Sequence, residues 1–277
     1  MCGVVFPHRE NVPDRLFPVS PDSESPAPKR ATGVQSVGKA IDVLEILTTS
    51  PTGELSLSDI TAATGQPMPT VHRLVRTLLD RGFLRQLPNR RYALGTELIV
   101  LGQAARSSFG SWSAPVLHEL VGEFGETVNL AVLDGDDVVY IGQSPSPHAV
   151  RMFTEIGRRI KPHATGVGKA LLGRLPDDQV LALLRRTGMP ARTPHTITTP
   201  EAFLDKVREA RKQGHALDNE EMELGVRCVA VPLPEARLNL ALSMSGPATR
   251  MTDAVIGRAL PRLHEAADQL AADFSAG

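Results

Sequence analysis

Residues 69–94 read PTVHRLVRTLLDRGFLRQLPNRRYAL, and this stretch decides the fold of the first part of the chain. Apolar side chains recur at helical spacing from Val71 to Leu79, and Gly82 is suited to end that helix. Residues 83–87 and 92–94 favour two short strands, because the Pro-Asn pair between them is typical of a turn. The stretch therefore predicts an amphipathic helix followed by a β-hairpin.

Two more helices are expected before this stretch. Residues 40–47 carry apolar side chains at the spacing of an amphipathic helix that begins near Gln35. Ser56 and Asp59 have the spacing of a capping box, and Gly65 is suited to end the second helix. The order helix, helix, helix, hairpin is that of a winged helix-turn-helix, which we assign to residues 34–95.

The polar face of the third helix is rich in hydrogen-bond donors. A helix in the major groove needs such side chains, because Arg binds guanine through two hydrogen bonds and Thr or His reaches phosphates or single base edges. Residues 34–95 carry seven basic and five acidic side chains, so the excess of positive charge is small. A solvated face of an ordinary helix is the alternative, which the helix-turn-helix order disfavours. The expected DNA-binding residues, on the helix and at the hairpin tip, are Thr70, His72, Arg73, Arg76, Thr77, Arg90 and Arg91.

The rest of the chain alternates between helical and strand patterns. Residues 96–107 favour a helix, and residues 96–110 are expected to link two domains. From Thr127 onward the pattern predicts an antiparallel sheet flanked by helices, in a domain of residues 111–277. Thr252 is the expected N-cap of a C-terminal helix that Pro261 should kink or restart. The expected strands are residues 127–133, 138–143, 149–154, 216–218, 227–232 and 238–243, and the expected helices before the last one are residues 168–175, 177–187 and 200–213.

Composition excludes several classes of protein. Of 277 residues, 42% are hydrophobic and 22% charged, as in an ordinary globular protein. The longest apolar stretches are far below the ~18–20 residues of a membrane-spanning helix. Residues 1–33 hold six of the 22 prolines and no apolar segment typical of a signal peptide, so we expect a disordered tail and a cytoplasmic protein with no membrane partner. Cys2 and Cys228 are too few for a disulfide framework or a metal cluster.

The segment HATGVGKA, residues 163–170, does not match the common catalytic motifs. A phosphate-binding loop needs Gly where His163 stands and a hydroxyl where Ala170 stands. The third glycine of a dinucleotide fingerprint is missing, and the chain has no G-x-S-x-G, H-E-x-x-H or C-x-x-C motif. We therefore expect no catalytic residues, no metal and no cofactor. Residues 165–169 suit an anion, because a small-residue turn entering a helix presents free N–H groups, but a tight turn for close packing explains them equally well.

Several segments resemble IclR-type bacterial transcriptional regulators. In the first half these are QSVGKA (35–40), PTVHRL (69–74), GFL (82–84) and RYALG (91–95). In the second half they are HATGVGKA and DNEEMELGVRCVA (218–230). The resemblance implies an α+β chain with an N-terminal winged helix-turn-helix domain, a linker helix and a C-terminal GAF-like α/β effector-binding domain.

The same resemblance implies where a small organic acid binds. In similar regulators the acid lies where the glycine-rich turn meets an Asp, a Cys and strand serines. The matching positions here are Gly166 and Val167 as N–H donors, Asp218 as an acceptor, Cys228 as a lining group, and Ser243 and Ser245 as hydroxyl donors on the same side of a strand. For Cys228, an inert core cysteine is at least an equal alternative. The nearby Glu220, Glu221 and Glu223 are interpreted as a solvated acidic loop.

The expected function is a ligand-responsive repressor of a catabolic operon that a small organic acid releases. Its expected partners are double-stranded operator DNA and copies of itself, in a homodimer or homotetramer. The alternative is a small-molecule enzyme with an accessory DNA-binding module, in which Asp218 and Cys228 act as acid–base or nucleophilic groups. A third hypothesis, a purely structural DNA-binding protein, does not account for the motifs of the second half.

Overall fold

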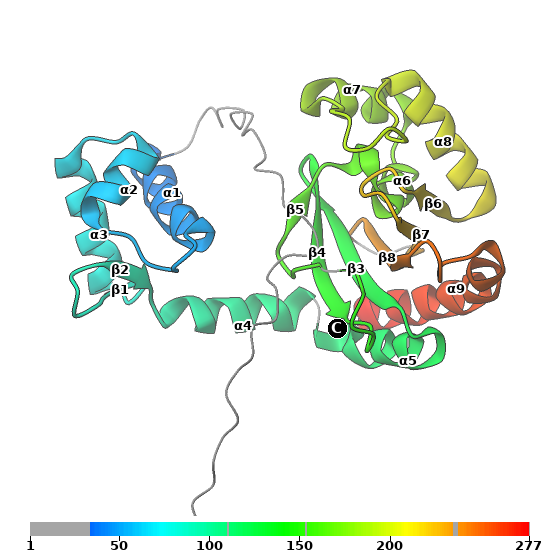
Figure 1. The fold of residues 1–277 in the computed structure, drawn as a ribbon, viewed down its shortest axis with the longest axis horizontal. Coiled ribbons are helices and arrows are strands. Elements are labelled where there is room, and N and C mark those ends of the chain that lie inside the picture. Colours follow the sequence, from blue (N-terminus) through cyan, green and yellow to red (C-terminus); the bar gives the residue numbers. More distant parts are fainter. Residues whose placement is uncertain (1–33, 110, 153, 235–237, 277) are drawn as a thin grey trace, which may run out of the picture. The chain divides into compact units, whose positions relative to one another are not determined.

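The computed structural model describes residues 34–109, 111–152, 154–234 and 238–276. The chain divides into two compact units, residues 1–95 and 96–277, and each has its own hydrophobic core (Figure 1). The tail expected over residues 1–33 lies outside the described residues.

The first unit contains three helices and a two-stranded antiparallel sheet. Its core is formed by apolar side chains from all three helices, and Val43, Ile60 and Val71 are fully buried. The helices are α1 (Gln35–Thr49), α2 (Leu57–Thr64) and α3 (Met68–Asp80), and the strands are β1 (Leu84–Gln86) and β2 (Tyr92–Leu94).

The expected capping box at the start of α2 is confirmed. The N–H of Asp59 donates to Oγ of Ser56 at 3.1 Å, and the N–H of Ser56 donates to Oδ2 of Asp59 at 3.0 Å. Gly65 ends the helix with a φ of 62°, in the left-handed region that glycine adopts without strain. The turn between α2 and α3 is thereby fixed by local chemistry.

The second unit is built on a six-stranded sheet with the spatial order β5-β4-β3-β8-β7-β6. Every pair of neighbouring strands is antiparallel. The strands are β3 (Thr127–Asp134), β4 (Asp137–Ser144), β5 (Arg159–Ile160), β6 (Ala216–Asn219), β7 (Val226–Pro232) and β8 (Leu240–Pro247).

Helices cover both faces of this sheet (Figure 1). On one face, α5 (Ala114–Phe124) and α9 (Asp253–Ala276) pack through a core that includes Leu120, Leu242 and Leu263. On the other face lies α6 (Gly166–Leu172), with α7 (Asp177–Thr187) and α8 (Pro200–Gln213) forming a further core around Phe203. The unit begins with α4 (Glu97–Phe109), and short 3-10 turns occupy Ser111–Ser113 and Pro162–Ala164.

The strand expected at residues 149–154 is wrong, because none of the described residues there is in a strand. The edge of β4 pairs instead with β5, with Val138 opposite Ile160. Ion pairs explain this choice of segment. Arg159 Nη1 lies 2.8 Å from Asp134 Oδ2, and Lys161 Nζ lies 2.7 Å from Asp137 Oδ1. These contacts hold the later segment at the edge of the sheet.

Pro261 does not restart the helix, which is the second of the two expected outcomes, because α9 continues from Asp253 to Ala276. Ala259 and Leu263, on either side of the proline, are fully buried, so packing on both sides compensates for one missing backbone hydrogen bond. Thr252 caps this helix as expected, since its Oγ1 accepts from the N–H of Val255 at 3.4 Å. The sequence pattern does not predict helix α5, which is found only in the structure.

Candidate DNA-binding surface and effector site

Helix α3 presents one apolar and one polar face. Val71, Val75 and Leu78 are buried in the core of the first unit. His72, Arg73, Arg76 and Thr77 are exposed, and Thr70 is half-buried. Neither arginine forms an ion pair with any residue that the structure describes, whereas the Thr77 hydroxyl donates to the carbonyl of Arg73 at 3.0 Å. The free donors of this face are therefore its two guanidinium groups and His72.

The two arginines at the tip of the β1–β2 hairpin lie in different environments. Arg90 is exposed and has a φ of 62°. Arg91 turns back to α2, with Nη2 3.1 Å from Asp59 Oδ2 and Nε 3.3 Å from Glu54 Oε1. Hydrogen bonds from Ser56, backbone first, and then the charge of Arg91 hold the pKa of the Asp59 carboxyl below its usual value. Among the described residues, the guanidinium of Arg91 therefore forms ion pairs and that of Arg90 forms none.

The predicted effector residues of the second unit form one row across its sheet. Asp218 is opposite Cys228, Cys228 is opposite Ser245, and Ser245 is opposite Thr127. Partners across antiparallel strands share a face, so these side chains lie on the face that packs against α6. Ser243 lies on the same face, two residues before Ser245. The structure thus brings the four predicted side chains of this set together.

This row is enclosed by protein. Asp218, Cys228, Ser243 and Ser245 are 1–8% exposed. Asn129, on the neighbouring strand β3, donates from Nδ2 to Oγ of Ser245 at 3.4 Å. These four side chains are therefore shielded from bulk solvent.

The glycine-rich turn lies directly against the row. A Cβ added at Gly166 would lie 3.3 Å from Sγ of Cys228 and 3.4 Å from the backbone nitrogen of Asp218. A Cβ at Gly168 would lie 2.0 Å from the carbonyl oxygen of Pro162, so no side chain fits there. Thr165 caps the helix by accepting from the N–H of Gly168 at 3.0 Å. Close packing is therefore one function of this turn, and it places the backbone of Gly166 beside Cys228 and the backbone of Asp218.

Burial changes the acid–base chemistry of the row. It raises the pKa of Asp218 to about 6, against the opposing effects of the Glu221 N–H, 2.7 Å away, and of the Lys169 charge. Burial and the neighbouring Asp218 raise the pKa of the Cys228 thiol to about 12. The thiol is therefore protonated at neutral pH and is a poor nucleophile.

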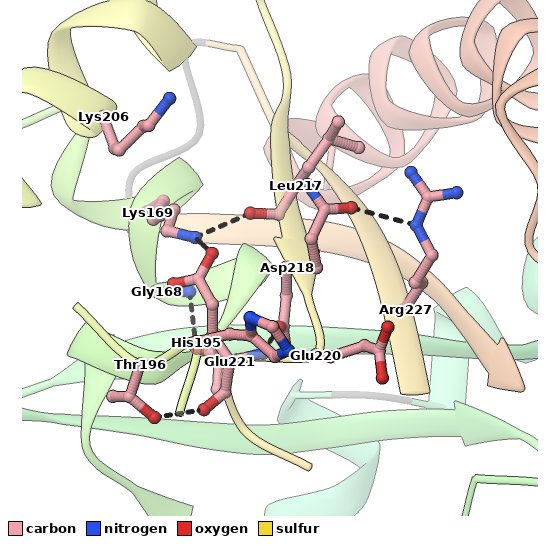
Figure 2. A network of polar contacts seen from close by, with 12 residues as sticks. Gly168, Lys169, His195, Thr196, Lys206, Leu217, Asp218, Glu220, Glu221 and Arg227 are labelled. Atoms are coloured by element: carbon pink, nitrogen blue, oxygen red, sulfur yellow. Dashed lines mark hydrogen bonds and ion pairs between the residues drawn. The ribbon is translucent and has the colours of Figure 1, made fainter. Parts of the chain in front are cut away.

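The interpretation of Glu221 as part of a solvated loop is wrong. Glu221 is 8% exposed, and its carboxylate forms an ion pair with Lys169, which is 3% exposed (Figure 2). Lys169 also donates to the carbonyl of Leu217 at 2.7 Å. Glu223 is exposed as expected. A lysine inside the apolar helix segment GVGKALL is the sequence signal for this pair, because a buried cation needs a partner.

Three further features of the described residues concern other kinds of site. No group of three or more His, Cys, Asp or Glu side chains among them is arranged to hold a metal ion. None of the described helices is both long and apolar enough to cross a membrane. A cavity of about 410 Å³ includes none of the row residues in its lining, which is formed by Glu123, Phe124, Glu126, His148, Arg250, Val255 and Arg258.

Comparisons with known proteins cover both units. The IclR helix-turn-helix domain matches residues 36–88, and the C-terminal domain of the bacterial transcriptional regulator IclR matches residues 107–272. Transcriptional repressor IclR of Escherichia coli (strain K12) is 36% identical over 231 residues, which are 80% of this chain and 84% of that protein. The Acetate operon repressor of Salmonella typhimurium (strain LT2) is 37% identical over 227 residues, 79% of this chain and 82% of that protein.

Solved structures agree with these matches. The crystal structure of an IclR transcriptional regulator from Alicyclobacillus acidocaldarius superposes with a TM-score of 0.77 at 29% sequence identity. The superposition covers 87% of this chain and 99% of that one. The chain therefore belongs to the IclR family of bacterial transcriptional regulators.

Proposed function

We propose that this protein is a repressor that binds double-stranded operator DNA through α3 and the β1–β2 hairpin, in the cytoplasm. The observation that carries this proposal is the exposed polar face of α3, where Arg73 and Arg76 have no competing ion-pair partner among the described residues. Arginine side chains can form hydrogen bonds to base edges in the major groove. Thr70, His72 and Thr77 would reach phosphates or single bases. Two relatives named as repressors support repression rather than activation.

We propose further that a small organic acid binds at the polar row and releases the DNA. The N–H groups of Gly166 and Val167 and the hydroxyls of Ser243 and Ser245 supply donors, and Asp218 binds a hydroxyl or carboxyl group of the acid. Cys228 lines the site. Its protonated thiol favours a sensor over an enzyme, because nucleophilic catalysis requires the thiolate.

The test is gel-shift binding to DNA upstream of the protein's own gene and its neighbours, repeated with a panel of small carboxylic acids and ureides. We expect a shifted band that one class of acid weakens. A shift that no compound changes would contradict the effector proposal. Absence of any shift at low salt would contradict the DNA-binding proposal, and turnover of an acid by the protein would favour the enzyme alternative.

We also propose a homodimer, or a homotetramer built from it. Large apolar side chains are exposed in each unit, which is typical of association surfaces. They are Val34, Val37 and Ile41 in and next to α1, and Ile99, Val100 and Leu101 in α4.

Replacing Leu101 by Glu should therefore shift the protein toward monomers. If this part of α4 forms the dimer interface, the charge of the new Glu side chain would be buried there. Burying that charge opposes association. Sedimentation velocity measures the change, and Gln103→Glu, also exposed on α4, is the matched control. An unchanged sedimentation coefficient in Leu101→Glu would place the dimer contact elsewhere.

The hairpin arginines should differ in the salt dependence of DNA binding. Arg90→Ala should weaken binding to all sequences and lower the slope of log K against log salt by about 1, because one phosphate contact is lost. Arg91→Ala should leave that slope near the original, because its guanidinium is already paired with Glu54 and Asp59. Fluorescence anisotropy over a series of salt concentrations measures both slopes. Equal losses of slope would show that Arg91 also contacts phosphate.

A further inference from the structure

Glu221 joins three segments of the second unit around the proposed effector site. Its carboxylate pairs with Lys169 of α6, and its N–H donates to Oδ1 of Asp218 at 2.7 Å. Its carbonyl accepts from the hydroxyl of Thr196, in the connection between α7 and α8, at 2.6 Å. Figure 2 shows these contacts meeting at the turn that follows β6.

Lys169 of α6 contacts a residue before Asp218 in the chain and a residue after it. Its ammonium group contacts the carbonyl of Leu217, the residue before Asp218, as well as the carboxylate of Glu221. The contact with Glu221 is buried and the contact with Leu217 is part-buried, so water competes little for the ammonium group. The ammonium group of Lys169 thus fixes the position of Asp218 relative to α6, because it binds Leu217 and Glu221 on either side of Asp218 in the chain.

The connection between α7 and α8 holds the same turn from outside. The hydroxyl of Thr193 donates to the carbonyl of Glu220 at 2.7 Å, and Nε2 of His163 lies 2.9 Å from the carbonyl of Pro190. The connection therefore contacts both the turn after β6 and the segment that leads into α6. Oε2 of Glu221 is buried and has no hydrogen-bond partner among the described residues, so it is open to a further donor.

We propose that Lys169 and Glu221 are positioning residues of the effector site, which hold the carboxyl group of Asp218 in place and so set its affinity for an acid. This inference rests on the proposed effector function. Neither residue needs to touch the acid, because the effect passes through Asp218.

The charges around Asp218 give this role a distinctive signature. The groups that face it are Lys169 from α6, Glu221 from the turn, Cys228 from β7 and Tyr140 from β4. The charge of Lys169 lowers the pKa of Asp218, and the carboxylate charge of Glu221 raises it. Removing each charge in turn should therefore move the pKa of Asp218 in opposite directions. A general loss of packing would not produce opposite shifts.

The first experiment follows the carboxyl group of Asp218 by carbon NMR in the full chain without any acid, with Asp218→Asn to assign the signal. We expect Lys169→Met to raise its titration midpoint and Glu221→Gln to lower it, each by about one pH unit. Lys212→Met removes an exposed lysine of α8, and it should leave the midpoint unchanged. Shifts in the same direction, or none, would overturn the inference.

The second experiment is calorimetry with glyoxylate, acetate and benzoate. Each single variant should bind the acid about tenfold more weakly at constant operator affinity. An unpaired buried charge destabilises the fold, so the double variant Lys169→Met/Glu221→Gln is the folded reference and should show the same loss. Wild-type affinity in the double variant would overturn the inference. If no acid binds the original protein, the effector proposal fails, and the NMR midpoints still decide the role of the pair.

Discussion

Replacing Asp218 by Asn is expected to abolish the response to the acid and to leave operator binding intact. Asn keeps the shape of the side chain and can still accept from the Glu221 N–H, so the turn after β6 keeps its contact. It cannot ionise, and one carboxyl oxygen is replaced by an NH2 group that no longer accepts from a hydroxyl or carboxyl group of the acid. Gel shifts with and without the acid measure the response. A variant that still releases DNA would place the effector elsewhere in the chain.

The same substitution should change the dependence of stability on pH. The pKa of Asp218 is raised from 3.8 to about 6 in the folded protein because burial disfavours its charged form. Its contribution to stability is therefore fully present below about pH 3.8 and is lost as the pH rises through about 6. Above pH 7 the ionised group costs about 3 kcal/mol, at about 1.4 kcal/mol for each pH unit by which the pKa is raised.

We therefore expect Asp218→Asn to gain about 1–2 kcal/mol of stability relative to the original protein between pH 5 and pH 8, because about half of the cost is already present at pH 5. Urea denaturation of the two proteins at both pH values measures this difference. The exposed Asp268→Asn is the matched control and should show a constant difference. A constant difference for Asp218→Asn as well would show that the carboxyl group ionises equally in the folded and unfolded chains.

Replacing Arg73 or Arg76 by Ala is the second change with a large expected effect. Either guanidinium, if it binds a base edge, contributes about 1–3 kcal/mol to the discrimination between operator and other DNA. The expected result is a loss of operator affinity of about 5- to 150-fold with a much smaller loss on unrelated DNA. Anisotropy titrations with the operator and with a scrambled duplex measure both affinities.

Arg81→Ala is the control for these variants. Arg81 is exposed at the C-cap of α3, beyond the last residue of the helix. It should not change the ratio of the two affinities. Operator affinity that is unchanged in both Arg73→Ala and Arg76→Ala would remove α3 from its recognition role, and equal losses on the two duplexes would assign the arginines to phosphates.

The elements predicted best from sequence are those fixed by local chemistry. The capping box of Ser56 and Asp59, the end of α2 at Gly65 and strand β2 all follow from residues within a few positions of one another. The strand β5 does not, because Arg159 is drawn to the sheet edge by Asp134, 25 positions away in the chain. Likewise, α9 continues through Pro261 because of its packing on a distant sheet.

In the candidate sites, too, local features were predicted better than contacts between distant residues. The spacing of Ser243 and Ser245 predicts that they share a face, and the strand register adds that Asp218 and Cys228 lie in the same row. The partners of charged side chains were harder to predict. Arg91 is paired with Glu54 and Asp59, more than 30 positions earlier, and Glu221 is paired with Lys169, 52 positions earlier. Such pairs are set by topology, which local patterns do not contain.

An acid bound to the second unit and operator DNA bound to the first should each change the affinity for the other, and thermodynamic linkage tests this coupling most directly. Calorimetry would measure the dissociation constant of the acid for the free protein and for the protein saturated with operator. If the acid lowers operator affinity by a given factor, the operator must lower acid affinity by the same factor. We predict equal factors in the two directions. An acid that binds equally well with and without operator would contradict the account.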